Sequence, residues 1–428
     1  MTNQVLNVAE EAVLSRISHT NITELARNLV RFPSFKEEET ELSLWLASYF
    51  GERGYDVEVQ EVGPGRLQTI ATLRGSGGGR SLMFNGHIDI DPLSSGWERD
   101  PFELQVDGDL MSAAGIINMK AGDTAMITAA EAIRTSGVRL RGDLVIACVV
   151  GELQGGIGTV HLLEQGIRTD MALVPEPDGS DYIKTTTAGV MNIAVTTIGK
   201  SEWTGYQSAG VDAIAKMGAV VSALRGMKFT ATLREDLPDL PLMNIGGILG
   251  GRGQEYRLNA ANFVSDRCTA LIDLRFLPDQ TAESVRSDID RVLQDLKKSD
   301  PELEYEIEIP PPARFGSNNV TFPPTDVPAD SPVVEILARS YERHVGSLPK
   351  AIGAQVPTSY GGADVAHLWQ AGIHAVIYGP TPGGDDDMGS PPALGAPGDA
   401  VSISDVHKVA SVLALSALEI CGTETDSH

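Results

Sequence analysis

The sequence predicts an α/β protein with a central, mostly parallel sheet flanked by helices, and a smaller α+β domain inserted into it. Three observations lead to this prediction. Short apolar runs alternate with helical patterns near both ends of the chain, which is typical of parallel sheets covered on both faces. Between these regions the order changes to strand–helix–strand–strand–helix. With 428 residues, the chain exceeds what one core usually holds, so we expect two domains.

The first region alternates predicted helices and strands. Amphipathic patterns predict helices, and polar–apolar alternation predicts strands that are half buried. The apolar runs at 81–85, 144–150 and 171–174 indicate strands that are buried on both faces. In chain order, the predicted elements are helices 7–30 and 38–54, strands 56–61, 67–73 and 81–85, helix 119–135, strand 144–150, helix 158–165 and strand 171–174.

The pattern changes near residue 186 and returns after the prolines at 310–312. We therefore predict one domain formed by 1–185 and 311–428, and an inserted domain at 186–310. The inserted domain is predicted to contain strand 191–198, helix 211–224, strands 243–249 and 268–276, and helix 282–296. Helices 332–344 and 364–371, strand 375–378 and helix 404–420 complete the first domain, with a loop rich in Gly, Pro and Asp at 381–399.

Composition restricts the partners and the compartment. The net charge of −25 disfavours binding to nucleic acid or to an anionic membrane. The three cysteines, Cys148, Cys268 and Cys421, lie far apart without metal-like spacing, which is typical of a reducing compartment. No signal peptide and no long apolar run are recognisable. We therefore expect a cytoplasmic protein without nucleic-acid or membrane partners.

His87 and Asp89 stand two residues apart at the end of the predicted strand 81–85. Because side chains alternate along a strand, both point to the same side. A carboxylate in that position orients the imidazole of a metal ligand. We interpret His87 as a metal ligand and Asp89 as a catalytic-site residue that supports it.

Three further polar residues, Asn118, Glu152 and Glu176, follow predicted strands or precede a helix. Divalent metals bind an imidazole together with oxygen donors, so His87, Asn118 and Glu176 are the candidate ligands. A hydrolytic metal site also needs a free carboxylate that takes a proton from the attacking water. We assign that catalytic role to Glu152.

Together with their flanking residues, these positions resemble the family of co-catalytic zinc peptidases and amidohydrolases. That family includes aminoacylase-1, acetylornithine deacetylase, succinyl-diaminopimelate desuccinylase and glutamate carboxypeptidase. The resemblance covers nearly the whole chain and implies a metallopeptidase-like catalytic domain, a ferredoxin-like lid and a homodimer formed through the lid. The matching segments are Gly86–Pro92, Gly96–Phe102, Asn118–Gly122, Gly151–Gly156, Glu176-Pro177, Gly361–Asp364 and Gly379-Pro380.

The chain departs from this family at the ligands of one metal. The family has an Asp that bridges two metals where this chain has Asn118, and a second Glu where it has Leu153. The family's C-terminal His ligand aligns near Gly395, and its lid His falls in the segment that ends at Trp203. These differences imply one divalent ion per chain, Mn²⁺ or Zn²⁺. Two alternatives remain: a metal-free binding module, and a rebuilt two-metal site that uses Asp385, Asp386 or Asp387.

Within the family, the resemblance is greatest to metal-dependent aminohydrolase chemistry on a nitroaromatic amine. The implied reaction converts 5-nitroanthranilate and water to 5-nitrosalicylate and ammonia. Trp203 is then expected to stack on the ring, Arg275 to pair with the substrate carboxylate, and Asn244 to reach the site of a partner subunit. The alternative is an amidase, dipeptidase or N-acyl-amino-acid deacylase of the same family. The second alternative is the metal-free pseudoenzyme.

Overall fold

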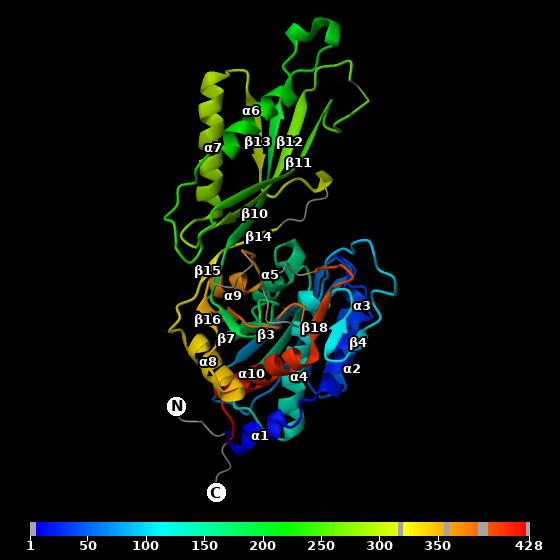
Figure 1. Cartoon of the computed structure of the whole chain (residues 1–428), viewed down its shortest axis with the longest axis vertical. Coiled ribbons are helices and arrows are strands. Elements are labelled where there is room, and N and C mark those ends of the chain that lie inside the picture. The colour runs from blue at the N-terminus through cyan, green and yellow to red at the C-terminus, as the bar shows by residue number, and fades with distance from the viewer. Residues whose placement is uncertain (1–5, 260, 316–319, 355–359, 384–392, 425–428) are drawn as a thin grey trace. The chain divides into compact units, whose positions relative to one another are not determined.

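The computed structural model describes residues 6–259, 261–315, 320–354, 360–383 and 393–424 (Figure 1). The chain divides into two compact units. Unit 1 comprises Met1–Thr187, Thr325–Ser359 and Ala363–His428, and unit 2 comprises Ala188–Pro324 and Tyr360–Gly362. The predicted return to the first domain at residue 311 is wrong by 14 residues, because β14 (Thr321–Phe322) still pairs with a strand of unit 2.

Unit 1 is built around a mixed eight-stranded sheet. Its four central strands, β6, β3, β7 and β17, run parallel to one another, so three of the predicted apolar runs lie side by side. In sheet order the strands are β1 (Asp56–Gly63), β2 (Arg66–Leu73), β6 (Leu144–Val149), β3 (Leu82–His87), β7 (Met171–Val174), β17 (His374–Ile377), β8 (Tyr182–Lys184) and β16 (Ala351–Gly353).

Successive side chains of a strand point to opposite faces of the sheet, so the apolar strands present apolar side chains on both faces. Helices cover both faces and bury these side chains. Phe84 joins the core under α2, α3, α4, α8 and α10, whereas its neighbour Met83 joins the core under α5 and α9. The helices are α1 (Val8–Leu14), α2 (His19–Val30), α3 (Thr40–Gly51), α4 (Ala121–Ser136), α5 (Ile157–Glu164), α8 (Pro332–Val345), α9 (Val365–Gln370) and α10 (Ile403–Cys421).

The single helix predicted over 7–30 is in fact two helices. The side chain of Ser18 accepts a hydrogen bond from the backbone N–H of Asn21 and thereby caps the start of α2. Two small sheets of unit 1 were not predicted, because their strands have only two or three residues and too little sequence for a period. They consist of β18 (Ala400–Ser402), β5 (Leu110–Ser112) and β4 (Gln105–Asp107), and of β15 (Thr325–Asp326) and β9 (Thr186–Thr187).

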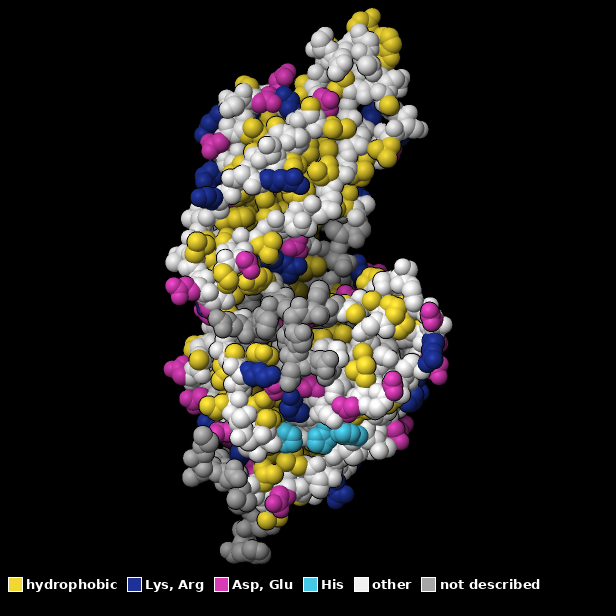
Figure 2. Space-filling view, viewed as in Figure 1, with side chains coloured by type: hydrophobic (Ala, Val, Ile, Leu, Met, Phe, Trp, Pro, Cys, Tyr) yellow, Lys and Arg dark blue, Asp and Glu magenta, His cyan; other side chains and the backbone are white. Residues whose placement is uncertain are grey.

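Unit 2 has the order β-α-β-β-α-β, in which the helices α6 and α7 pack on an antiparallel sheet. The last strand, β13, was not predicted. Figure 2 shows hydrophobic side chains along one face of this unit. The elements are β10 (Gly189–Ile198), α6 (Ala213–Arg225), β11 (Leu242–Gly251), β12 (Arg267–Phe276), α7 (Ala282–Ser299) and β13 (Glu304–Glu308).

Within the described ranges, no helix is long and apolar enough to cross a membrane. Cys148, Cys268 and Cys421 are buried and free.

Candidate active site

The parallel strands of unit 1 bring the predicted site residues together at their carboxyl ends. His87 is the last residue of β3, Glu152 follows β6 in a short 3₁₀ turn, and Glu176 follows β7 by two residues. Asn118 lies in the turn Ile116–Lys120 before α4. His87 Nε2 lies 3.1 Å from Asn118 Oδ1, 3.8 Å from Glu176 Oε1 and 3.9 Å from Glu152 Oε2.

Asp89 fixes the orientation of the His87 ring. His87 Nδ1 lies 2.9 Å from the backbone oxygen of Asp89 and 3.5 Å from its carboxylate. A carbonyl oxygen can only accept, so Nδ1 carries a hydrogen, and in the neutral ring the lone pair of Nε2 faces the site. The Asp89 carboxylate also accepts from the backbone N–H of Glu152 at 3.2 Å and of Leu153 at 3.0 Å. Asp89 therefore connects the metal-ligand candidate to the turn that carries the candidate base.

The side chain of Asn118 is oriented in the same way by an acceptor. Its Nδ2 donates to Asp91 Oδ2 at 3.1 Å, which turns Oδ1 toward His87. The preceding backbone is held by Asp399, whose carboxylate accepts from the N–H groups of Gly115 at 2.7 Å and Ile117 at 2.8 Å. Neither Asp91 nor Asp399 was predicted as part of the site.

The site concentrates buried carboxyl groups around one imidazole. Burial raises the pKa of Glu176 and of Asp364 to about 7, and raises the pKa of Glu152 well above its ordinary value, in each case with added repulsion from neighbouring carboxylates. Burial would lower the pKa of His87, but the hydrogen bond to Asp89 and the charge of Glu176 outweigh it and raise that pKa. Asp364 is a site residue that the sequence reasoning missed, although it ends the matching segment Gly361–Asp364.

These contacts fit a divalent cation. His87 Nε2 and Asn118 Oδ1 present lone pairs to each other across 3.1 Å, an arrangement that a cation or an added proton between them would stabilise. The distances from Nε2 to Asn118 and Glu176 are those expected between two ligands that share one ion at about 2.0–2.2 Å. In the described part of the chain, no group of three or more His, Cys, Asp and Glu side chains is arranged to hold a metal. The predicted set contains only two such side chains, because its third member is an amide.

Neither position of the missing ligands supplies a side-chain donor, and one of them, at residue 395, is sterically closed. Leu153 offers no donor in its side chain. Gly395 has a φ of +64°, and a Cβ built there would lie 2.4 Å from the backbone oxygen of Pro92. Its own carbonyl oxygen accepts from Ser94 N at 2.9 Å and from Trp97 Nε1 at 3.2 Å. A histidine therefore does not fit at position 395 on this backbone. Asp385, Asp386 and Asp387 lie outside the described residues.

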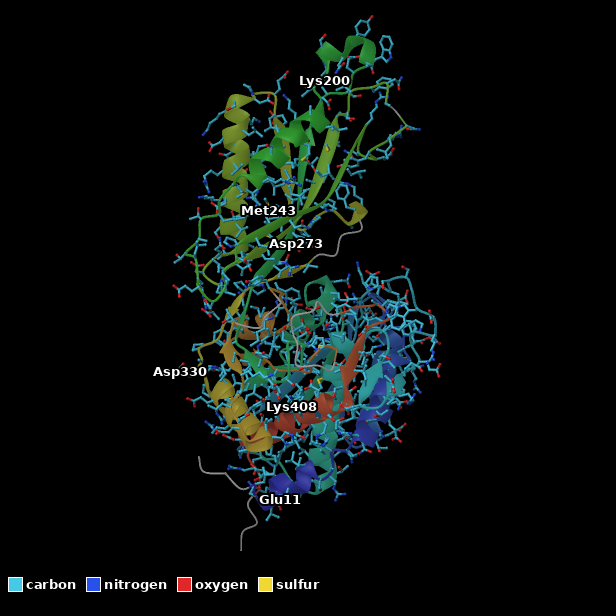
Figure 3. The ribbon with its side chains drawn as sticks, in the orientation of Figure 1. Glu11, Lys200, Met243, Asp273, Asp330 and Lys408 are labelled. Atoms are coloured by element: carbon cyan, nitrogen blue, oxygen red, sulfur yellow. The ribbon has the colours of Figure 1, made fainter. Side chains whose placement is uncertain are left out.

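The three substrate-binding candidates belong to unit 2. Trp203 is 49% exposed, and its ring meets that of Tyr206 edge to face with centroids 5.7 Å apart. Asn244 is exposed on β11 beside a cavity of about 650 Å³. Arg275 donates two hydrogen bonds to the carboxylate of Asp273, at 2.7 and 3.0 Å. Figure 3 labels Asp273. Arg275 already has a carboxylate partner, so its contact with a substrate carboxylate stays a prediction.

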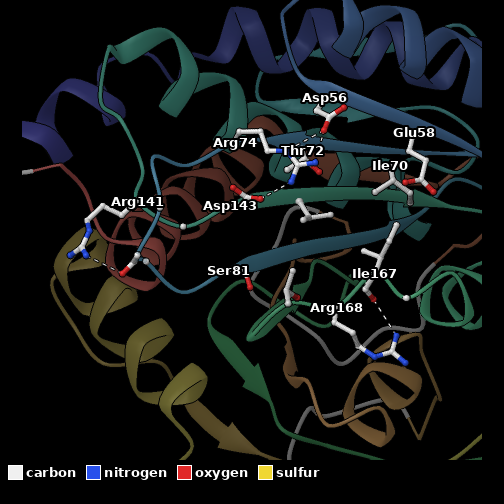
Figure 4. Close-up of a pocket in the computed structure, with 17 residues that line it drawn as sticks. Asp56, Glu58, Ile70, Thr72, Arg74, Ser81, Arg141, Asp143, Ile167 and Arg168 are labelled. Carbon is white, nitrogen blue, oxygen red and sulfur yellow. Dashed lines mark hydrogen bonds and ion pairs between the residues drawn. The ribbon is translucent and has the colours of Figure 1, made fainter.

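A separate cavity of about 480 Å³ lies near the amino-terminal ends of the parallel strands of unit 1, opposite to the candidate active site (Figure 4). Its lining includes Ser81, Asp143 and Thr169, which precede β3, β6 and β7. Sites in parallel sheets form at the carboxyl ends of strands, not at these amino ends. Arginines and carboxylates also balance in the lining, which contains Arg74, Arg141, Arg168, Asp56, Glu58 and Asp143. We do not assign the active site to this cavity.

Comparisons with known proteins identify a family and relatives of this chain. A family model described as peptidase family M20/M25/M40 matches residues 83–418. The chain is 27% identical to N-formyl-4-amino-5-aminomethyl-2-methylpyrimidine deformylase of Bacillus subtilis (strain 168), over 84% of this chain and 87% of that protein. It is 26% identical to acetylornithine deacetylase of Myxococcus xanthus, over 86% and 89%. The Bacillus subtilis YxeP protein, a dinuclear metal binding peptidase from the M20 family, shares the fold with a TM-score of 0.65, 18% identity and coverage of 95% and 99%.

Proposed function

The chain belongs to peptidase family M20/M25/M40, and on that premise we propose that it is a metal-dependent hydrolase that cleaves a C–N bond of a small substrate with one divalent ion per chain. The names of its relatives, a deformylase and a deacetylase, support hydrolysis of a C–N bond. The hydrogen bonding of Asn118 supports a single ion per chain. Its amide nitrogen is hydrogen-bonded to Asp91, so that only its oxygen is left for a metal.

The residues of the chain have distinct tasks in this reaction. His87, Asn118 and Glu176 would hold the ion, which would lower the pKa of water and so supply a nucleophile at neutral pH. Glu152 lies beside these ligands without a hydrogen bond that would commit its carboxylate elsewhere among the described residues. Glu152 takes a proton from the attacking water and delivers it to the departing nitrogen. Asp89 holds both the His87 ring and the backbone of Glu152.

For the substrate, the relatives favour an N-acyl amine. Water adds to the acyl carbon, the C–N bond breaks, and a carboxylic acid and an amine are released. This amidase or deacylase reaction has the support of both curated relatives. A small acyl group agrees with the formyl and acetyl groups in their names.

The second candidate is the hydrolytic deamination of 5-nitroanthranilate, which would make the protein a 5-nitroanthranilic acid aminohydrolase. Neither relative named above carries that name, but the lack of a donor side chain at Leu153 and Gly395 favours a reaction that one ion can support. Water adds to the ring carbon that bears the amino group, and the para nitro group takes up the negative charge. The C–N bond then breaks, and ammonia leaves with the proton held by Glu152. This reaction needs activated water and a held ring, but no second cation.

One experiment separates the two candidates. Purified protein is treated with a chelator, reloaded with Mn²⁺ or Zn²⁺, and assayed with 5-nitroanthranilate for ammonia release and with N-formyl and N-acetyl amines for amine release. Metal-dependent turnover of one substrate class selects that candidate. Turnover of neither class with any metal would contradict the proposed function and favour the metal-free binding module.

We also propose that the active form is a homodimer joined through unit 2. The strand β11 is at the edge of its sheet and exposes Leu242, Ile248 and Leu249. An exposed apolar edge strand is a ready surface for pairing with a second chain. Sedimentation of the purified protein tests this, and a monomer at micromolar concentration would contradict it.

A further inference from the structure

Asp91 selects one of the two orientations of the Asn118 amide. With Nδ2 donating to Asp91 Oδ2 at 3.1 Å, Oδ1 lies 3.1 Å from His87 Nε2. An amide turned by 180° would direct its hydrogens toward the site, and an N–H group does not bind a cation. A carboxylate has no hydrogen to donate, so Asp91 accepts only from the nitrogen end of Asn118.

We propose that Asp91 is a positioning residue that commits Asn118 to serve a single ion as a neutral oxygen ligand, an inference that rests on the one-ion function proposed above. A bridging carboxylate offers one oxygen to each of two ions. In this chain the second oxygen is replaced by a nitrogen, and Asp91 occupies the hydrogen-bonding side of that nitrogen. The hydrogen bond between Asn118 and Asp91 stands where a second metal–ligand bond would otherwise form.

The same short segment closes the second missing ligand position. Pro92 follows Asp91, and its backbone oxygen occupies the space that a Cβ on Gly395 would need. The backbone N–H of Gly395 also donates to the Asp399 carboxylate at 3.3 Å. The same carboxylate accepts from the backbone N–H of Ile117, in the turn that contains Asn118. The segment Asp91-Pro92 therefore links the two departures at positions 118 and 395, which are far apart in the sequence.

Metal affinity tests the positioning role without an activity assay. Mn²⁺ binding to chelated protein is measured by calorimetry for the wild type, Asp91→Ala and Asp91→Asn. Loss of the acceptor in Asp91→Ala is expected to weaken binding about tenfold or more. Asp91→Asn keeps an oxygen that accepts from Asn118, but its amide can also turn and donate, so its affinity is expected to lie between those of Asp91→Ala and the wild type. If Asp91→Ala binds Mn²⁺ as tightly as the wild type, Asp91 does not position Asn118 and the proposal is overturned.

The chain offers a matched control. Asn192 Nδ2 donates to Asp273 Oδ2 in unit 2, also at 3.1 Å. Asp273→Ala therefore removes a hydrogen bond between the same atom types at the same distance, outside the proposed metal site. It also removes the two hydrogen bonds from Arg275, so it perturbs unit 2 at least as much as Asp91→Ala perturbs the site. Its Mn²⁺ affinity is expected to equal that of the wild type. An equal loss in Asp273→Ala and Asp91→Ala would reduce the effect to general destabilisation and overturn the proposal.

A swap of the two residues gives a second readout in metal-free protein. Asn118→Asp places two carboxylates where a donor and an acceptor now meet, so Tm is expected to fall by several degrees. Adding Asp91→Asn restores a donor, now on residue 91, and is expected to recover most of the loss. If the changes in Tm of the two single variants simply add in the double variant, the residues are not coupled and the proposal is overturned. If the wild type binds no ion but the swap recovers Tm, the proposed function fails while the pairing of Asp91 and Asn118 stands.

Discussion

The backbone N–H of Glu152 donates to the carboxylate of Asp89 at 3.2 Å, while the ring of His87 lies against the same residue. Asp89 thus fixes the distance between the candidate metal ligand His87 and the candidate base Glu152. Its carboxylate is held in the ionised form, because hydrogen bonds from His87 and from the turn at Glu152 outweigh the effect of burial and lower its pKa. The geometry of the proposed reaction therefore depends on a residue that needs no contact with substrate.

We expect Asp89→Asn to weaken metal binding by about 10–100-fold, because an amide holds the His87 ring less firmly and no longer accepts at both oxygens. Calorimetric titration with Mn²⁺ measures the change. Asp288→Asn is the control, since Asp288 is also buried and accepts a backbone N–H, that of Thr230, but lies in unit 2. Unchanged affinity in Asp89→Asn would remove Asp89 from the site.

Glu152→Gln is expected to separate catalysis from metal binding. The amide cannot take a proton from water, so kcat should fall by about 10²–10⁴-fold, the usual range for loss of a general base. Metal affinity should stay close to the wild-type value, because the proposed ligands are His87, Asn118 and Glu176. Steady-state kinetics and metal analysis on the same preparation measure both quantities. A variant that keeps its activity would show that another group is the base.

Metal stoichiometry tests the count directly. After chelation and reloading, we expect one tightly bound divalent ion per chain by elemental analysis, with activity reaching its plateau at one equivalent. Two equivalents bound with similar affinity would contradict the one-ion proposal. That outcome would favour the rebuilt site in which Asp385, Asp386 or Asp387 replaces a lost ligand.

Gly395→Ala is expected to destabilise the fold more than a left-handed backbone alone requires. The added Cβ meets the Pro92 oxygen at 2.4 Å, so the cost should be about 2–4 kcal/mol from strain and overpacking together. Gly108→Ala is the matched control, because Gly108 has a similar φ of +59° and open space around it. Its expected cost is about 1–2 kcal/mol. Equal losses of unfolding free energy in denaturant titrations would contradict the steric argument.

The parts of the site that follow strands were predictable, and the parts that support them were not. His87, Glu152 and Glu176 each follow an apolar run, and parallel pairing of β3, β6 and β7 brings those ends together. The carboxylate of Asp399 accepts a hydrogen bond from the backbone N–H of Gly115, which lies 284 residues away in the sequence. No local sequence pattern predicts such a contact. Asp91 lies in the matching segment Gly86–Pro92, but only the structure reveals its hydrogen bond to Asn118.

The same distinction applies to the fold. Long elements with a clear period, such as α7 and α10, were predicted to within a few residues. The strands β4, β5 and β18 have three residues each and are defined by pairing between distant segments, so periodicity could not find them. The domain boundary near 311 was misplaced for a related reason. The prolines at 310–312 indicate a break, but the chain returns to the sheet of unit 2 through β14 before it enters unit 1.

We predict that a histidine cluster in unit 1 makes the stability of the protein depend on pH. His407 lies between His19 and His344, with ring centroids 5.5 and 6.2 Å away, and Figure 2 shows histidines in a row on this face of unit 1. Burial, then the neighbouring His407 and Lys408, lower the pKa of His344 to about 4. The unfolded chain, with an ordinary His pKa of about 6.5, binds more protons between these two values. The free energy of unfolding should therefore decrease as pH falls from about 6.5 to about 4.

His344→Gln should remove part of this dependence. The contribution of His344 is absent at pH 8, where the residue is neutral in both states, and costs the wild type on the order of 1 kcal/mol near pH 5 after allowance for its partial exposure. The free energy of unfolding of the variant should therefore increase relative to that of the wild type as pH falls. Guanidinium titrations at pH 8 and near pH 5 measure this difference. NMR titration of the His344 ring checks the cause, and His407→Gln should raise the pKa of His344. An ordinary pKa for His344 in the folded wild type would contradict the argument, because the cluster would then impose no cost on protonation.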